Sequence, residues 1–297
     1  MIIIKLMGGL GNQMFQYALG RRLALDHGNQ IKLDLNWFVT QTKRRYELNQ
    51  FNITLEVASS KDLEKFPHYS HSRFRRLLYN RIEKWIPRQA RIIINEPSYG
   101  VFYPHVLEVT GNKYLVGYWQ SERYFKPIEA YLREEFRLKQ PLSVEDQVLA
   151  TEMYCNPYSV CVHVRRGDYV SDYHINRYHY VCTPDYYDKT MRLMNEKLGG
   201  KAFFYVFSDD PTWCSSEMSY PSGYKIISND KRSTADELIM MSNCQNAVIS
   251  NSSFGWWGAW LCNNNEKIII VPKIWFADSG YKTTDLIPEN WLKLLDE

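Results

Sequence analysis

Three short apolar runs in the second half of the chain are each followed by polar side chains and then by a segment with helical periodicity. The runs cover residues 159–162, 202–207 and 247–249. Strands that alternate with helices in this way predict an α/β fold with a parallel sheet. In such a sheet the carboxyl ends of the strands meet at one edge, where ligands bind. The polar side chains after the three runs are therefore expected to form a ligand site.

The first half of the chain begins with a similar unit. We expect a strand over residues 1–7, a tight loop at Gly8–Asn12, a helix over residues 13–26 and a strand over residues 31–35. The glycine loop has neither the G-x-G-x-x-G spacing nor the P-loop spacing. A left-handed turn and a close approach of the backbone to a ligand both explain its three glycines, and the local sequence favours neither.

The length of 297 residues exceeds what one hydrophobic core usually organises, which predicts two domains. The polar stretch around Pro141 marks the expected boundary. We therefore expect two Rossmann-like lobes, residues 1–140 and residues 141–297.

Charge and cysteine content exclude several classes of protein. The net charge of +3 is too small to indicate a nucleic-acid partner. The six cysteines show no CxxC spacing, which argues against a zinc site and a disulfide framework and favours free thiols in a reducing cytoplasm. The apolar start of the chain is too short for a signal peptide or a membrane span. We therefore expect a cytoplasmic protein.

The first polar strand end carries His163, Arg165, Arg166 and Asp168. Guanidinium groups hold phosphate in two-point geometry, so this pattern suggests a seat for a diphosphate. Taken alone, the motif is better explained by a surface ion pair between Arg166 and Asp168 that orders a turn. The neighbouring strand ends reverse that preference.

The other two strand ends carry Asp209 and Asp210, and Ser252 and Ser253. A carboxylate can accept hydrogen bonds from a base or a ribose, and serines at a helix N-terminus supply backbone N–H donors for phosphate. The three ends together resemble a nucleotide site. Adjacent carboxylates on one strand point to opposite faces, so we expect no metal at Asp209 and Asp210.

Two aromatic segments allow more than one interpretation. Trp256 and Trp257 suit sugar stacking, but the usual distribution of tryptophan favours the core. Residues 73–91 place apolar side chains on one face of a helix and arginines on the other. A basic face on a core-packed helix explains this by default, and a membrane-surface helix is the alternative. His174 and His179 lie in a tyrosine-rich loop, for which a plain exposed loop is the preferred interpretation and a general base is the alternative.

Four motifs in this order resemble the bacterial α-1,2-fucosyltransferases, glycosyltransferase family 11. The motifs are residues 8–17, 163–169, 207–210 and 250–260, and lesser similarity occurs at residues 45–48, 117–121, 271–273 and 288–291. The resemblance therefore extends from residue 1 to about residue 291. The sequence differs from the family pattern at Gly255, where the family frequently has serine. We expect this difference to affect only the capping of a helix.

The resemblance implies a GT-B-like fold of two lobes, with the acceptor on the N-terminal side and GDP-β-L-fucose in the C-terminal lobe. It implies an inverting transfer of fucose to O2 of a terminal β-galactose in an O-antigen, capsule or H-type glycan, without a cofactor or a required metal. A transferase that uses another nucleotide sugar and a non-catalytic carbohydrate-binding protein are the alternatives. Independently of the resemblance, the membrane-surface alternative for residues 73–91 would give the protein a peripheral contact with the inner membrane.

The resemblance also suggests a role for each candidate residue. Arg165 would contact the β-phosphate, and His163 would lie near the guanine nucleotide. Asn12 would face the reacting centre. Asp168 is the nearest carboxylate in the sequence of the motif and is either the base or a partner of Arg166 or of a nucleotide group. Arg165, Asp168 and Asn12 form the expected catalytic set. The donor-binding set is expected to comprise Gly9, His163, Arg165, Arg166, Asp209, Asp210, Ser252, Ser253 and Phe254.

Overall fold

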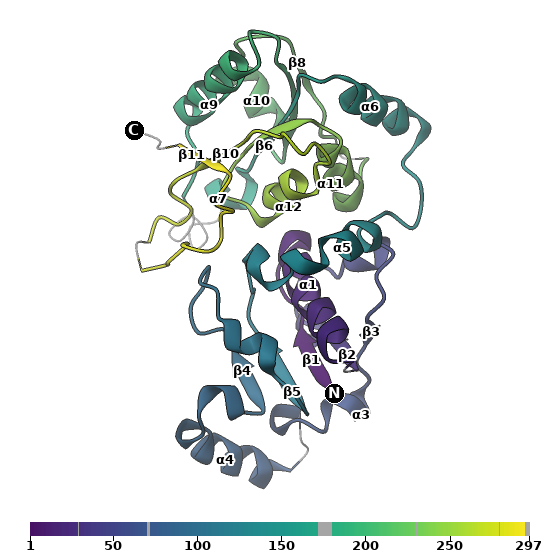
Figure 1. The fold of residues 1–297 in the computed structure, drawn as a ribbon, viewed down its shortest axis with the longest axis vertical. Helices are drawn as coiled ribbons and strands as arrows, with labels where there is room; N and C mark the ends of the chain where they lie inside the picture. Colours follow the sequence, from purple (N-terminus) through teal and green to yellow (C-terminus); the bar gives the residue numbers. More distant parts are fainter. Residues whose placement is uncertain (29, 70–71, 172–179, 230, 279, 295–297) are drawn as a thin grey trace. The chain divides into compact units, whose positions relative to one another are not determined.

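The chain folds into two compact units. The computed structural model describes residues 1–297 except 29, 70–71, 172–179, 230, 279 and 295–297. The N-terminal unit comprises Met1–Phe136 and Lys282–Ile287, and the C-terminal unit comprises Arg137–Tyr281 and Pro288–Glu297. Figure 1 shows both units along the chain.

The late segment Lys282–Ile287 joins the N-terminal unit through Asp285. The backbone N–H of Phe102 donates to Asp285 Oδ2 at 2.9 Å, and Arg123 Nη1 lies 2.6 Å from Asp285 Oδ1. These contacts join parts of the chain that are far apart in sequence, so no linear boundary can describe the unit.

The N-terminal unit is built on a parallel sheet with the strand order β3-β2-β1-β5-β4. All its strands are short and end at the same edge. They are β1 (Ile2–Lys5), β2 (Ile31–Asp34), β3 (Glu56–Val57), β4 (Ile93–Asn95) and β5 (Lys113–Val116).

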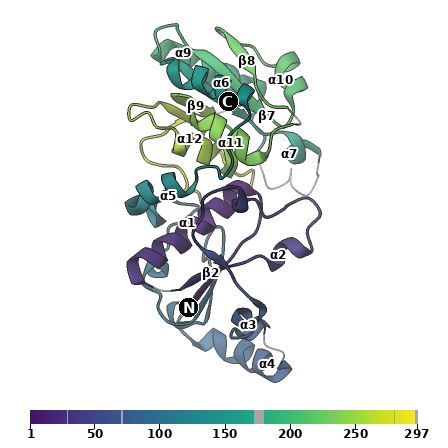
Figure 2. The same ribbon diagram turned by 90° about the vertical axis from the view of Figure 1, so that its right-hand side faces the viewer.

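Helices cover both faces of this sheet. Gly20 in α1 (Leu10–His27) brings that helix against Ile4 and Ile31, because a Cβ at Gly20 would lie 3.0 Å from Ile4 and 3.3 Å from Ile31. Ile3 points to the opposite face, as alternation along a strand requires. There it packs with residues of α3 (Ser60–Leu63) and α4 (Arg73–Ile82), which Figure 2 shows next to each other.

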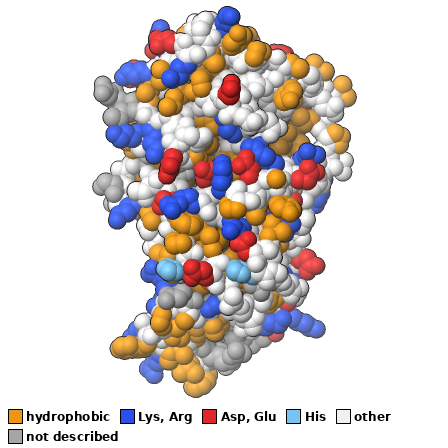
Figure 3. All heavy atoms as spheres, in the orientation of Figure 1, with side chains coloured by type: hydrophobic (Ala, Val, Ile, Leu, Met, Phe, Trp, Pro, Cys, Tyr) orange, Lys and Arg blue, Asp and Glu red, His pale blue; other side chains and the backbone are white. Residues whose placement is uncertain are grey.

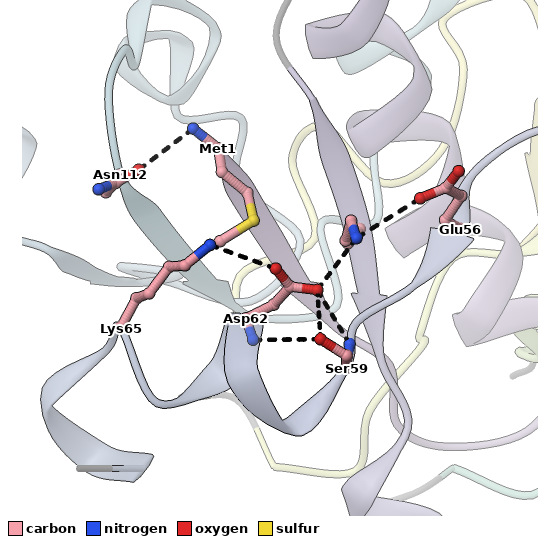
Figure 4. Close-up of polar contacts among 7 residues, drawn as sticks. Met1, Glu56, Ser59, Asp62, Lys65 and Asn112 are labelled. Atoms are coloured by element: carbon pink, nitrogen blue, oxygen red, sulfur yellow. Dashed lines mark hydrogen bonds and ion pairs between the residues drawn. The ribbon is translucent and has the colours of Figure 1, made fainter.

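A polar cluster around Asp62 fastens α3 to β2 (Figure 4). Ser59 and Asp62 form a reciprocal cap, in which Asp62 N donates to Ser59 Oγ at 3.3 Å and Ser59 N donates to Asp62 Oδ2 at 3.1 Å. Lys32 from β2 lies 3.0 Å from Asp62 Oδ2, and Lys65 lies 3.3 Å from Oδ1. The hydrogen bonds from Ser59, followed by those from Lys32, hold the pKa of Asp62 well below its usual range.

The C-terminal unit contains a second parallel sheet with the order β11-β10-β9-β6-β7-β8. Its central strand β6 is buried along its whole length. The strands are β6 (Ser159–Val164), β7 (Phe203–Ser208), β8 (Tyr224–Ile226), β9 (Asn246–Ile249), β10 (Ile269–Pro272) and β11 (Leu292–Leu294).

Helices lie on both faces of this sheet as well (Figure 1). The side chains of α9 (Pro184–Lys197) and α10 (Pro211–Glu217) pack on one face, in a core with Val160, Val162 and Val164. The other face meets α12 (Ser253–Leu261), which packs on α11 (Thr234–Ser242). Trp256 and Trp257 are fully buried, which confirms the prediction that they belong to the core.

The remaining helices are short or peripheral. They are α2 (Asn36–Val39), α5 (Glu129–Glu135), α6 (Val144–Cys155) and α7 (Gly167–Ser171). Single 3₁₀ turns occur at Leu48–Gln50, Pro67–Tyr69, Glu83–Trp85, Arg88–Ala90, Pro104–Glu108, Glu122–Tyr124 and Lys126–Ile128.

The structure confirms the predicted fold class, two Rossmann-like parallel α/β units in one chain. Several element boundaries differ from the prediction. Helix α1 begins at Leu10, inside the expected glycine loop, because Gly9 takes the N-cap position. Strand β1 ends at Lys5 rather than at residue 7, and β2 ends at Asp34 rather than at residue 35.

Candidate active site

The three polar strand ends of the C-terminal unit lie side by side. Strand β6 pairs with β7 on one side and with β9 on the other, and all three run parallel. His163 is in register with Phe207 and with Ile249. The segments that leave these strands therefore start from neighbouring points of one sheet edge, as the sequence predicted.

Arg165 and Arg166 are both anchored on Asp209. Arg165 Nη1 lies 2.8 Å from Asp209 Oδ2, and the backbone N–H of Arg166 donates to Asp209 Oδ1 at 2.8 Å. A Cβ at Gly167 would lie 2.6 Å from the same carboxylate, so glycine at 167 allows the turn to close on Asp209. The guanidinium of Arg165 also lies 5.6 Å above the ring of Tyr169.

Arg166 is held against an aromatic ring and a helix cap. Its guanidinium carbon lies 3.9 Å from the centre of the Trp213 ring, a cation–π contact. Its Nε lies 3.5 Å from Asp210 Oδ2, an ion pair too long for a good hydrogen bond, and Nε has no hydrogen-bond partner among the described residues. Asp210 caps α10 by accepting from Trp213 N at 3.1 Å. The sequence suggested Asp168 as the ion-pair partner, but the side chain of Asp168 lies outside the described part of the structure.

His163 is buried and neutral. Only 4% of its surface is exposed, and its Nδ1 lies 3.0 Å from Ser250 Oγ. Phe254 packs on the imidazole, with ring centres 5.6 Å apart. Burial, and then the nearby charge of Arg165, lowers the pKa of His163 to about 3. The side chain can therefore donate or accept a hydrogen bond at neutral pH without carrying a charge.

The absence of a side chain at Gly255 makes room for His163. A Cβ at this position would lie 2.5 Å from His163 Nδ1. The helix cap is Ser252, whose side chain accepts from Phe254 N at 3.3 Å, so Ser253 and Phe254 form the first turn of α12. The expectation that Gly255 affects only capping is wrong, because this residue packs against the imidazole.

Asn251 is a structural residue of this edge that the sequence analysis missed. It is 1% exposed, and its Nδ2 donates to the carbonyl groups of Tyr180 and Trp275, both at 2.7 Å. Tyr169 donates to its carbonyl oxygen at 3.2 Å. These partners are far away in sequence, so no local signal marks Asn251. His174 and His179 lie outside the described residues.

The glycine loop occupies the carboxyl edge of the N-terminal sheet. Gly8 has a left-handed φ of 82°, and a Cβ there would lie 2.4 Å from Asn12 Nδ2. A Cβ at Gly9 would lie 3.6 Å from Arg44 Nη1, which is ordinary contact. The buried Gln13 ties this loop down by donating to Gly8 O at 3.1 Å and to Arg45 O at 2.8 Å. Gly8 therefore provides the tight turn.

Asn12 is oriented by Gln120, which follows the neighbouring strand β5, and Gln120 is in turn bonded by Tyr99, which follows β4. Gln120 Nε2 donates to Asn12 Oδ1 at 2.6 Å. Tyr99 donates to Gln120 Oε1, and Gln120 itself is 2% exposed. The half-buried Asn12 thus has a fixed amide orientation at the end of a buried hydrogen-bond chain. The sequence predicted a site role for Asn12 but gave no sign of its contact with Gln120.

Glu96 fixes the turn that carries Gln120. Its carboxylate accepts from Tyr118 N at 2.7 Å and from Trp119 N at 3.1 Å. Trp119 has a left-handed φ of 57°, a strained conformation for a bulky residue. Burial raises the pKa of Glu96 to about 7, although the two backbone hydrogen bonds act in the opposite direction. Glu96 has no sequence motif that could have identified it.

The candidate residues thus form two groups. His163, Arg165, Arg166, Asp209, Asp210, Ser252, Ser253 and Phe254 are in the C-terminal unit, and Gly9 and Asn12 are in the N-terminal unit. Within the described part of the chain, no group of three or more His, Cys, Asp or Glu side chains is arranged to hold a metal ion.

Comparison with known proteins identifies the family. The chain matches Glycosyl transferase family 11 over residues 1–294. It is 33% identical to an α-1,2-colitosyltransferase of Escherichia coli, over 99% of this chain and 98% of that protein. It is 31% identical to the O-antigen biosynthesis glycosyltransferase WbnK of Escherichia coli, over 97% of this chain and 99% of that protein.

More distant similarity extends to an animal enzyme and to a solved structure. A galactoside 2-α-L-fucosyltransferase of Caenorhabditis elegans is 26% identical over 65% of this chain and 56% of that protein. The crystal structure of the fucosyltransferase NodZ from Bradyrhizobium covers 86% of this chain and 91% of that chain, at 12% identity and a TM-score of 0.48. The family assignment depends on the match over the whole chain and on the two bacterial relatives: the protein belongs to glycosyltransferase family 11 and is a glycosyltransferase related to O-antigen α-1,2-transferases.

Proposed function

We propose that the protein transfers L-fucose from GDP-β-L-fucose to O2 of a terminal β-galactose, with inversion at the anomeric carbon. The observation that carries this proposal is the anchored guanidinium of Arg165 at the carboxyl edge of β6, 2.8 Å from Asp209. The names of the relatives support the α-1,2 linkage, and the name of the Caenorhabditis elegans relative supports fucose and a galactoside. The acceptor would be an oligosaccharide such as an O-antigen unit.

Arg165 would stabilise the leaving group. As O2 of the acceptor attacks C1 of fucose, the C1–O bond to GDP breaks and its electron pair moves to the β-phosphate oxygen. A fixed cation beside that oxygen lowers the activation barrier of transfer, because negative charge develops on the oxygen where the N–H groups of the guanidinium already point. A guanidinium carries five N–H donors, so the contact with Asp209 serves to orient it.

The neighbouring elements would bind the rest of the nucleotide. The first turn of α12, with Ser252 as its cap, presents backbone N–H groups of the kind that hold phosphate. The neutral imidazole of His163 suits a hydrogen bond to an uncharged nucleoside. Arg166 supplies the second positive charge of this edge, so we propose that two guanidinium groups compensate the diphosphate and that transfer needs no metal.

The N-terminal unit would position the acceptor. Asn12 is held by Gln120 at 2.6 Å, and an amide of fixed orientation can bind a sugar hydroxyl group. The proton of O2 must leave as the glycosidic bond forms, and we propose Asp168 as the base that receives it. This assignment follows from its position directly after Gly167 in the arginine motif.

A panel of donors tests the proposal. The purified protein is incubated with a β-galactoside and, separately, with GDP-fucose, GDP-3-deoxyfucose (the colitose donor) and UDP-sugars, and the linkage of the product is determined by NMR. We expect an α-1,2-fucoside from GDP-fucose. Preference for the 3-deoxy donor would make the protein a colitosyltransferase. Product from UDP-sugars alone would contradict the proposal that the sugar donor is a GDP-sugar.

Calorimetry separates an enzyme from a carbohydrate-binding protein. A transferase with this site binds GDP in the absence of any sugar, whereas a lectin has no need of a diphosphate seat. Binding of β-galactosides without binding of GDP would therefore overturn the proposal.

A further inference from the structure

Helix α4 and the turns that follow it expose an apolar face to solvent. Phe74 is 73% exposed, Leu77 66% and Trp85 82%, and Leu78 and Ile82 are also exposed. Residues 74, 77, 78 and 82 follow helical spacing and so lie on one side of α4. A surface helix normally turns its apolar side to the core, and here that side faces outwards. We call the exposed side chains of Phe74, Leu77, Leu78, Ile82 and Trp85 the α4 apolar face.

Among the described side chains of α4, Tyr79 packs into the N-terminal unit. Tyr79 is 5% exposed, packs in the cluster with Phe66 and Ile93, and accepts a hydrogen bond from Ile93 N at 3.1 Å. The core therefore holds α4 through Tyr79 and leaves the α4 apolar face in solvent. The default interpretation from sequence, a basic face on a helix that packs its apolar side on the core, is wrong for these residues.

The charge of the segment favours a negatively charged partner surface. Residues 73–91 contain seven basic side chains and one acidic side chain, a net charge of +6, whereas the whole chain carries only +3. Arg81, Lys84 and Arg88 are exposed. Figure 3 shows hydrophobic and basic side chains together over α4, which Figure 1 labels at the lower end of the same view.

We infer that the α4 apolar face and its basic flanks dock on an anionic lipid bilayer as an interfacial helix. An amphipathic helix with aromatic and leucine side chains on one side and Lys/Arg beside them lies in the plane of a membrane surface and prefers anionic lipids. Trp85 is of the residue type enriched at that depth. A second copy of the chain fits less well, because dimerisation through this face would bring two segments of charge +6 together.

The inference goes beyond the proposed function and does not depend on the identity of the sugar. None of the helices in the described part of the chain is long and apolar enough to span a bilayer. Attachment through α4 would therefore be peripheral and reversible. It would bring the N-terminal unit to the membrane surface.

Vesicle co-sedimentation tests this inference with the full chain. We expect the protein to bind phosphatidylcholine vesicles that contain phosphatidylglycerol and to bind pure phosphatidylcholine vesicles much more weakly. Raising the ionic strength from about 0.1 M to about 1 M shortens the Debye length from about 10 Å to about 3 Å and is expected to release most of the protein. Equal binding to both kinds of vesicle, or no binding to either, would contradict the inference.

Paired variants assign the binding to this face. Phe74→Ser with Trp85→Ser is expected to weaken binding by roughly a hundredfold, because burial of each ring contributes about one factor of ten or more. Arg81→Glu with Lys84→Glu is expected to weaken it by roughly thirtyfold or more, because each lost basic charge contributes about a factor of five and the new carboxylates add repulsion. The matched control is Val39→Ser with Val144→Ser, at residues 83% and 78% exposed, which should retain vesicle binding.

Three further measurements separate membrane binding from misfolding and from dimerisation. Thermal unfolding and turnover of a water-soluble acceptor should be the same in Phe74→Ser/Trp85→Ser and in the unmodified protein, since both side chains face solvent. Analytical ultracentrifugation without lipid should show no effect of the same variant. If that variant instead dissociates a dimer, the α4 apolar face is an interface between copies and the membrane inference fails.

Discussion

Asp209 holds Arg165 at the carboxyl edge of the second sheet, with Arg165 Nη1 2.8 Å from Asp209 Oδ2. The other oxygen of the same carboxylate accepts the backbone N–H of Arg166 at 2.8 Å. One acidic residue directly after β7 thus orients the side chain of Arg165 and the backbone of Arg166 in the motif that follows β6. This makes Asp209 a positioning residue for the proposed phosphate contact.

Replacing Asp209 should weaken donor binding more than it slows chemistry. In Asp209→Asn the charge that orients Arg165 is lost, and we expect KM for GDP-fucose to rise by about tenfold, the effect of a hydrogen bond to a charged group. Steady-state kinetics measures this. Asp188→Asn is the matched control, because Asp188 forms a 2.8 Å ion pair with Arg192 away from this edge. If both substitutions raise KM for GDP-fucose equally, Asp209 has no special role in positioning Arg165.

A side chain at position 255 should damage the site. Alanine is better than glycine inside a helix by about 1 kcal/mol, but the new Cβ would lie 2.5 Å from His163 Nδ1. Overpacking of a core costs about 1–3 kcal/mol, so we expect a net loss of unfolding free energy in Gly255→Ala. Denaturant unfolding measures it. In the double variant with His163→Ala the clash should be relieved, so its loss of unfolding free energy should be smaller than the sum of the two single losses. If the two losses add, Gly255 and His163 do not clash.

Acid should destabilise the protein through His163. Its pKa is lowered from 6.5 to about 3 in the folded state, so between these values the unfolded chain binds more protons. Above pH 6.5 the imidazole is neutral in both states and does not change the unfolding free energy with pH. As the pH decreases from 6.5 towards 3, the unfolded state gains a proton that the folded state does not, so the unfolding free energy falls. Urea unfolding at a series of pH values should show a shallower slope in His163→Gln. An unchanged slope would mean that the imidazole is charged in the folded protein.

Gln120 should affect the acceptor and leave the nucleotide unaffected. Gln120→Ala removes the donor that holds Asn12 at 2.6 Å, so we expect kcat/KM for the galactoside to fall by about tenfold, the effect of one lost buried hydrogen bond. Calorimetric affinity for GDP should not change. Gln147→Ala, on the surface helix α6, is the control for loss of a glutamine side chain. A loss of GDP affinity in Gln120→Ala would mean that Gln120 and Asn12 contribute to binding the nucleotide sugar rather than the acceptor.

The order of elements and the polar strand ends could be predicted because they follow from local patterns. The apolar runs before His163, Asp209 and Ser252 are true neighbouring strands, and their alternation with helices determines the parallel sheet. The aromatic string with Trp256 and Trp257 could be assigned to the core from residue type alone.

Residues whose role depends on distant partners could not be predicted. Asn251 bonds to Tyr180 and Trp275, and Glu96 bonds to the turn at Trp119, all through contacts that only the folded chain creates. Gly255 looked like a capping difference because its neighbour in space, His163, is on another element. The outward direction of the α4 apolar face was also hidden, since periodicity shows that a helix has an apolar side but not where that side points.

The rate of fucose transfer by Arg165→Ala tests the central claim most directly. Loss of one fixed donor to a developing oxyanion typically lowers the rate by about 10²–10³. We expect a decrease of that size in kcat/KM with GDP-fucose and a β-galactoside, with little recovery in Arg165→Lys, because an ammonium group lacks the guanidinium fork. Circular dichroism should show that both variants are folded. Turnover by folded Arg165→Ala near that of the unmodified protein would contradict the role of Arg165 as the group that stabilises the departing diphosphate.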